Sequence, residues 1–195
     1  MNILCSSKFF VIYILAVCHL FYGYYFTQIY KYYGNRYIND DQFLSVIGSV
    51  ASLFNGFFKF LWASALDYYP FKRIYGFLIC LELFSIVIVY WAVHNKWTYM
   101  IVCCITWMCD GSLTAMLPAV TVGQFGIERG PQVYSYMYSV FGVSSMIGLT
   151  LIDMGAKDTV GFNGMQVISF CFSSVAGIMA ICLKEKKPFD YVEVY

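Results

Sequence analysis

Six long apolar stretches, separated by short polar segments, take up almost all of the 195 residues of this chain. They cover residues 9–30, 43–66, 74–93, 99–122, 133–152 and 166–183. Each is about 20 residues long, the length that an α-helix needs to cross the roughly 30 Å hydrocarbon core of a bilayer. A segment in lipid must satisfy its own backbone hydrogen bonds, so the pattern predicts six transmembrane helices. We therefore expect an all-α integral membrane bundle, with residues 1–195 forming a single six-helix transmembrane domain.

Composition supports a multi-pass membrane protein. Hydrophobic residues make up 61% of the chain and charged residues only 12%, whereas a soluble domain carries about 25% charged residues. The first apolar stretch is longer than the core of a signal peptide, which predicts a retained membrane helix. The sequence does not distinguish the plasma membrane from the mitochondrial inner membrane, and a net charge of +1 gives no hint of a nucleic-acid partner.

Seven of the eight cysteines lie within the apolar stretches, where a thiol behaves as a small hydrophobic group. No CxxC pair and no Cys/His cluster with metal-ligand spacing occurs in the sequence. Nucleophile–base spacings and phosphate-binding glycine loops are also missing from it. We therefore expect neither a metal nor a cofactor, and we do not expect an enzyme.

Basic residues give the predicted orientation. Six crossings put both termini on one side of the membrane, and that side receives seven basic residues against four on the other. The first group is Lys8, Lys72, Arg73, Arg129, Lys184, Lys186 and Lys187, and the second is Lys31, Arg36, Lys96 and Lys157. The positive-inside rule then places both termini in the cytoplasm, or in the matrix of a mitochondrion.

Aromatic and small residues suggest which surfaces meet lipid. Tyrosines and tryptophans crowd the predicted helix ends, at residues 22–33, 68–69, 90–91 and 97–99, as interfacial belts do; an aromatic substrate box is the competing interpretation. Small residues recur at 48–52 and 142–148, and they let helices approach closely in lipid. The second and fifth helices are thus predicted to pack in the interior, and the first to face more lipid.

Four ionisable residues fall within predicted spans, where a charge is costly and marks a candidate site: His19, Lys59, Glu82 and Asp110. Lys59 either snorkels along its aliphatic stem or forms a cationic site for an anionic substrate. Asp110 could pair with Lys59, shuttle a proton or cap a break in its helix, and the ion pair is favoured over the relay. Glu82 and His19 are interpreted first as hydrogen-bonded interior residues. Pro118 is expected to kink the fourth helix.

Two segments resemble a known family. Residues 55–62 read Asn-Gly-Phe-Phe-Lys-Phe-Leu-Trp and are followed by Asp67, Lys72 and Arg73. This segment resembles N-G-x-G-R-x-x-W-G-x-x-S-D-x-x-G-R-R of the oxalate/formate antiporter branch of the major facilitator superfamily, a monocarboxylate transporter-like branch. A second segment is similar to that family's tenth-to-eleventh helix region. It comprises residues 109–112 (Cys-Asp-Gly-Ser), Pro118-Ala119, Phe125-Gly126, Gly130, Tyr134 and Gly142.

The resemblance implies the C-terminal six-helix half of a twelve-helix transporter. Within the matching segments, Lys59, Asp110 and Asn55 are the substrate-binding candidates, and Asp67, Lys72 and Arg73 form the gating loop. His19 is a further substrate-binding candidate because it is an ionisable residue within a predicted span. Departures from the pattern include Phe58 in place of a glycine and Phe141 at the position of the family's second cation. A monocarboxylate is therefore easier to accommodate than a dicarboxylate.

Two functions follow as hypotheses. The first is a half-size or split carrier that moves a small organic anion, such as a carboxylate, by alternating access between two six-helix halves. It would pair with a second copy or another half-size chain. The alternative is a transporter-derived structural subunit of a larger membrane complex without transport activity. Both imply contact with the bilayer and with other membrane subunits, and neither involves nucleic acid.

Overall fold

The computed structural model describes residues 6–153 and 161–183, and within these residues every regular element is a helix. The helices are α1 (Ser7–Ile38), α2 (Asp41–Ala65), α3 (Phe71–Ala92), α4 (Lys96–Phe125), α5 (Gly130–Met137), α6 (Ser139–Leu151) and α7 (Gly161–Cys182). Five of them are long and apolar enough to cross a membrane. The predicted fifth span consists of α5 and α6, which are separated at Tyr138. The all-α membrane bundle is confirmed.

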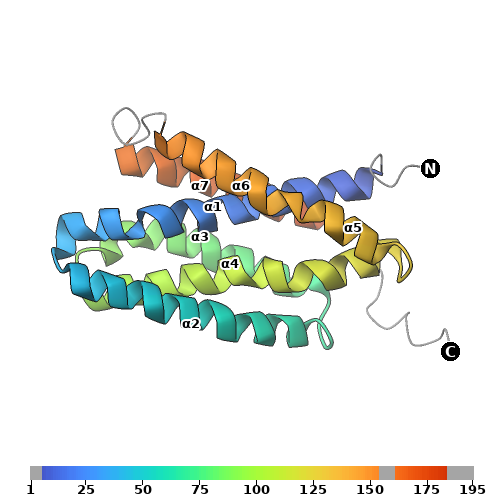
Figure 1. Cartoon of the computed structure of the whole chain (residues 1–195), viewed down its shortest axis with the longest axis horizontal. Coiled ribbons are helices and arrows are strands. Elements are labelled where there is room, and N and C mark those ends of the chain that lie inside the picture. Colours follow the sequence, from blue (N-terminus) through green and yellow to red (C-terminus); the bar gives the residue numbers. More distant parts are fainter. Residues whose placement is uncertain (1–5, 154–160, 184–195) are drawn as a thin grey trace.

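The helices run back and forth along one axis (Figure 1). α1, α3 and α4 occupy the middle of the bundle, with α2 along one edge and α6 and α7 along the opposite edge (Figure 1). The Lys72 Nζ atom at the start of α3 donates to the Ile181 carbonyl at the end of α7, at 2.8 Å. Six alternating passes place the first turn of α1 and the last turn of α7 at the same end, as the sequence predicted.

Short turns with matching cap residues separate the helices. α1 ends at Asn39, whose φ of 48° is left-handed, a conformation that asparagine tolerates. Asp40 then accepts a hydrogen bond from the Phe43 amide at 3.0 Å and caps α2, and Asn95 caps α4 in the same way through the Trp97 amide. These local signals fix the hairpins that bring α1 beside α2 and α3 beside α4.

The burial of the helices corrects one expectation. α1 is the most buried span, with 67% of its most apolar window inside the bundle, whereas the value for α2 is 17%. α6 buries only Val140, Ser144 and Gly148. The prediction that the second and fifth helices are interior and the first is peripheral was therefore wrong. Bulky residues on all faces of α1 fill a core among α4, α6 and α7. On α2, the small residue Gly48 lies against Tyr30 of α1, and most of the remaining packing of α2 is against α4.

The prediction of interfacial aromatic belts was only partly correct. Tyr68, Trp91 and Trp97 are exposed at helix ends, as a belt requires. Tyr22 and Tyr25, in contrast, are fully buried and pack with rings from α4 and α7. The reason is that α1 continues to Ile38, eight residues past the predicted boundary at residue 30, so these tyrosines lie inside the bundle.

Candidate functional site

A polar cluster lies in the middle of the bundle. The His19 Nδ1 atom of α1 lies 2.8 Å from the Glu82 Oε2 atom of α3, and both side chains are almost completely buried. The Ser173 hydroxyl of α7 donates to Glu82 Oε1 at 2.8 Å. Each of these residues lies near the midpoint of its helix, at the depth where an uncompensated charge would cost most.

The same cluster reaches α4. The His19 Nε2 atom lies 3.2 Å from the Cys109 carbonyl oxygen. Both ring nitrogens of His19 therefore have neighbours, and the cluster joins α1, α3, α4 and α7. The interpretation of His19 and Glu82 as hydrogen-bonded interior residues is confirmed. His19 does not face an open surface in this conformation, which leaves its role as a substrate ligand a prediction.

Asp110 is the residue after Cys109 on α4, and its carboxyl group packs against α1. A Cβ atom placed on Gly23 would lie only 2.7 Å from the Asp110 Cβ atom and would overlap the carboxylate. Asp110 Oδ1 is buried and has no hydrogen-bond partner among the described residues. The Asp110 carboxyl interacts electrostatically with His19, Glu82 and Lys59. It thus connects the buried cluster to the α2 side of the bundle.

Asn55 and Lys59 lie on α2, one helical turn apart. The Asn55 Nδ2 atom donates to the Trp107 carbonyl at 2.8 Å, and its amide packs directly against Gly111. Lys59 is partly buried, and its ammonium group has no hydrogen-bond or ion-pair partner among the described residues. The favoured contact ion pair with Asp110 is not formed, and the two charges interact at longer range.

Toward its start, α2 carries a stripe of exposed hydroxyl groups at Ser45, Ser49 and Ser52. Ser49 and Ser52 donate to carbonyls one turn earlier on the same helix, so the stripe does not need outside partners. Lys59 differs from these serines because its charge cannot be satisfied within the helix. It is the group on this face that most requires an anion, water or an opposing protein surface.

The predicted gating loop lies at the other end of α2. Asp67 and Arg73 are exposed there, and Lys72 donates to the carbonyl of Ile181. The ion pairs within residues 6–153 and 161–183 are His19–Glu82, Lys31–Asp41 and Lys96–Asp40, so none of them includes Asp67. The gating role of Asp67, Lys72 and Arg73 stays a prediction.

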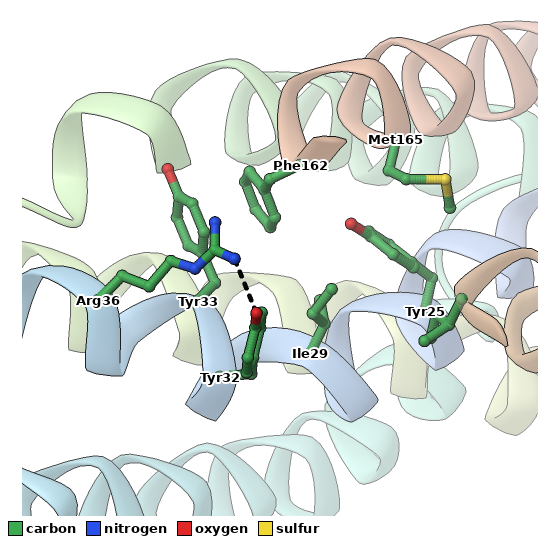
Figure 2. Close-up of a pocket in the computed structure, with 8 residues that line it drawn as sticks. Tyr25, Ile29, Tyr32, Tyr33, Arg36, Phe162 and Met165 are labelled. Carbon is green, nitrogen blue, oxygen red and sulfur yellow. Dashed lines mark hydrogen bonds between the residues drawn. The ribbon is translucent and has the colours of Figure 1, made fainter. Parts of the chain in front are cut away.

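Figure 2 shows a pocket between α1 and the adjoining ends of α6 and α7. The Arg36 Nη2 atom donates to the Tyr32 hydroxyl at 2.7 Å, and the guanidinium lies 4.8 Å from the centroid of that ring. Tyr33 and Phe162 stack with ring centroids 3.4 Å apart. The pocket lies on the opposite side of α1 from α2, so it is separate from the surface that carries Lys59 (Figures 1 and 2). None of the four substrate-binding candidates lines it, whereas Tyr25, Tyr32 and Tyr33 come from the tyrosine-rich segment 22–33.

A comparison of the sequence with known protein families identifies the superfamily of this chain. The model of the Major Facilitator Superfamily matches residues 9–193, and the chain therefore belongs to this superfamily. The match makes the chain a multi-pass integral membrane protein of a transporter family. A comparison with curated proteins finds no match. The oxalate/formate branch and the carboxylate substrate rest on the resemblance alone and are taken up below as proposals.

Two residues of the cluster were missed at the sequence level. Gly23 stands alone between Tyr22 and Tyr24, and a single glycine inside a helical pattern is a signal of close approach that could have been used. Ser173 stands in a Ser-Ser pair on α7, and nothing in the sequence distinguishes it from Ser174. Only the packing of α3 against α7 shows that Ser173 is the partner of Glu82.

Proposed function

We propose that this chain forms one wall of a carrier for a small monocarboxylate, and that Lys59 supplies the fixed positive charge at its substrate site. The main support for this proposal is that Lys59 is partly buried on an apolar helix and has no counter-ion in contact with it among the described residues. A charge in this setting is costly in lipid, and a bound anion removes part of the cost. A charge-assisted contact of this kind contributes about 1.5–3 kcal/mol.

The surroundings of Lys59 favour one carboxylate over two. Asp110 carries the opposite charge within electrostatic range, which lowers the net positive potential at the site. Phe141, the residue aligned with the family's second cation, is apolar and packs edge-on against Tyr138 at 4.8 Å. A dianion would therefore find one full cation and one nearby carboxylate, a poorer match than a monoanion.

The open α2 surface also requires an opposing wall. Carriers of this superfamily bind substrate between two six-helix units that rock against each other. We propose that a second unit covers the surface formed by α2 and the adjoining parts of α1 and α4, on the same polypeptide or as a separate subunit. A scaffold that uses the same surface for permanent assembly is the alternative function. It is favoured by the phenylalanine at position 58, where the family pattern has a glycine.

Ligand-dependent stability separates the two functions. A ligand that binds only the folded protein raises its unfolding temperature. The purified full chain should be stabilised by lactate and acetate, but not by the matched neutral amides lactamide and acetamide. Lys59→Met should remove this effect, and Lys59→Arg should keep part of it. Lys96→Met is the control, since it removes a lysine at the start of α4. Equal responses to acids and amides would favour the scaffold.

A further inference from the structure

The pocket of Figure 2 joins an apolar interior to a cationic rim. Its inner wall is formed by Ile29, Phe162 and Met165 (Figure 2). Arg36 lies at the outer edge and is exposed. The pocket offers about 20 Å³ of space beyond its lining atoms, room for a single small polar group at its inner end. The pocket changes from apolar to cationic along its length, which complements a phospholipid, whose apolar acyl chains lead to an anionic phosphate.

Two buried hydroxyls in this pocket, those of Tyr25 and Tyr33, lack a hydrogen-bond partner among the described residues. Tyr25 has none of its surface exposed, and its Oη atom has no hydrogen-bond partner among the described residues. Figure 2 shows this hydroxyl aimed into the space beside Phe162 and Met165. A buried hydroxyl without a partner costs free energy, so an oxygen atom of a ligand or of water is expected there.

The guanidinium of Arg36 at the rim is fixed in a position where it can bind an anion. Its stacking over Tyr32 and its hydrogen bond to the Tyr32 hydroxyl fix one side of the guanidinium. A guanidinium has five N–H donors, so further donors are available to a phosphate. Arg36 lies on the part of α1 that follows the apolar stretch ending at residue 30. This part of the helix is at the level of the headgroups and not of the acyl chains.

We propose that this pocket binds the headgroup of an anionic phospholipid. The phosphate lies on Arg36 at the exposed rim, and one headgroup or ester oxygen enters the pocket and accepts from the Tyr25 hydroxyl. The lipid thereby ties α1 to α6 and α7 at the end of the bundle where α1 turns into α2. An arginine at the level of the headgroups suits a phosphate, because its guanidinium can donate two parallel hydrogen bonds to the phosphate oxygens.

The test compares retained lipid by native mass spectrometry of the full chain, released from nanodiscs that contain phosphatidylcholine and phosphatidylglycerol. The unmodified chain should retain phosphatidylglycerol preferentially. Arg36→Gln should lower its retention roughly fivefold, the factor expected for one lost cation near the surface. Tyr25→Phe should lower it as well while phosphatidylcholine binding stays unchanged. Lys96→Gln is the matched control, because it removes a basic residue at the same end of the bundle, and it should retain phosphatidylglycerol.

Several outcomes would overturn the proposal. Equal loss in Lys96→Gln and Arg36→Gln would show general surface attraction instead of a site. Full retention in Arg36→Gln would exclude this pocket. Displacement of the lipid by inorganic phosphate, with phosphate itself remaining bound, would identify a free anion as the occupant. A chain that shows no preference between the two lipids would leave water as the partner of the Tyr25 hydroxyl. A thermal unfolding scan of each variant in phosphatidylcholine alone establishes that the variants are folded.

Discussion

Gly23→Ala tests the contact that seats Asp110 against α1. The added methyl group would overlap the carboxylate, and even the Asp110 Cβ atom would lie 2.7 Å away. Rotating the Asp110 side chain moves its oxygens but cannot move its Cβ atom, so α1 and α4 must separate. Forcing an extra methyl group into a packed site costs about 1–3 kcal/mol.

A matched glycine on a free surface supplies the baseline. Gly76 lies on α3, and a Cβ atom placed on it would meet nothing within 4 Å. Gly76→Ala should stabilise the chain by up to about 1 kcal/mol through helix propensity alone. Gly23→Ala has the same propensity gain but adds the overlap. The two variants should therefore differ by roughly 1–3 kcal/mol, with Gly23→Ala the less stable.

The assay is the free energy of unfolding of each variant, measured by denaturant titration in mixed micelles with the signal of the native tryptophans. Equal stability of the two variants, within about 0.5 kcal/mol, would refute the contact between Gly23 and Asp110. It would also remove the structural link between the buried cluster and the Lys59 surface.

Three further predictions concern α2, Asp110 and orientation. Asn55→Leu should lower the free energy of unfolding by about 0.5–1.5 kcal/mol, because it removes the hydrogen bond at 2.8 Å that ties α2 to the Trp107 carbonyl, which keeps its bond within α4; an unchanged denaturation midpoint would contradict this. Asp110→Asn should tighten carboxylate binding, since it removes the opposing charge near Lys59; weaker binding in calorimetric titrations would refute the assignment of that charge. Cysteines introduced on a cysteine-free background at Asn39 and Glu128 should be labelled from opposite sides of the membrane, with the Glu128 side facing the cytoplasm or matrix. Labelling of both from one side would overturn the topology.

The helices could be predicted from the sequence because membrane spans leave a strong signal. An apolar run of about 20 residues has few alternatives to a helix in lipid. The break at Tyr138 could not be predicted in the same way. No proline or glycine marks it, and it falls where the span passes from packing on α4, near Gly130, to packing on α1, near Gly148.

The extent to which each helix is buried could not be predicted from the sequence. In lipid, apolar residues are equally suited to the interior and to the surface, so hydropathy does not reveal which face is covered. Tyr22 and Tyr25 were assigned to a belt for this reason, although tertiary packing with Tyr99 and Phe172 holds such rings in the core. Small residues on α2 suggested an interior helix, whereas only one side of α2 is covered, by α4 and, at Gly48, by α1.

The candidate residues were found, but their arrangement was not. Four ionisable residues in apolar runs were identified from the cost of burying charge. Pairing them required distances across the chain: His19 and Glu82 are 63 positions apart and meet only because α1 and α3 both pack on α4 and α7. The favoured partner of Asp110, Lys59, turned out to lie beyond contact distance, which left it available for an anion.

Uptake of labelled lactate into proteoliposomes containing the full chain tests Lys59 as the substrate cation, in comparison with Lys59→Met and with the control Lys96→Met at equal protein content. Protein-free liposomes measure passive entry. We expect uptake above this background to be lost in Lys59→Met, retained in part in Lys59→Arg and unchanged in Lys96→Met, since only Lys59 neutralises the carboxylate within the membrane. Undiminished uptake by folded Lys59→Met would contradict the assignment of Lys59 as the substrate cation.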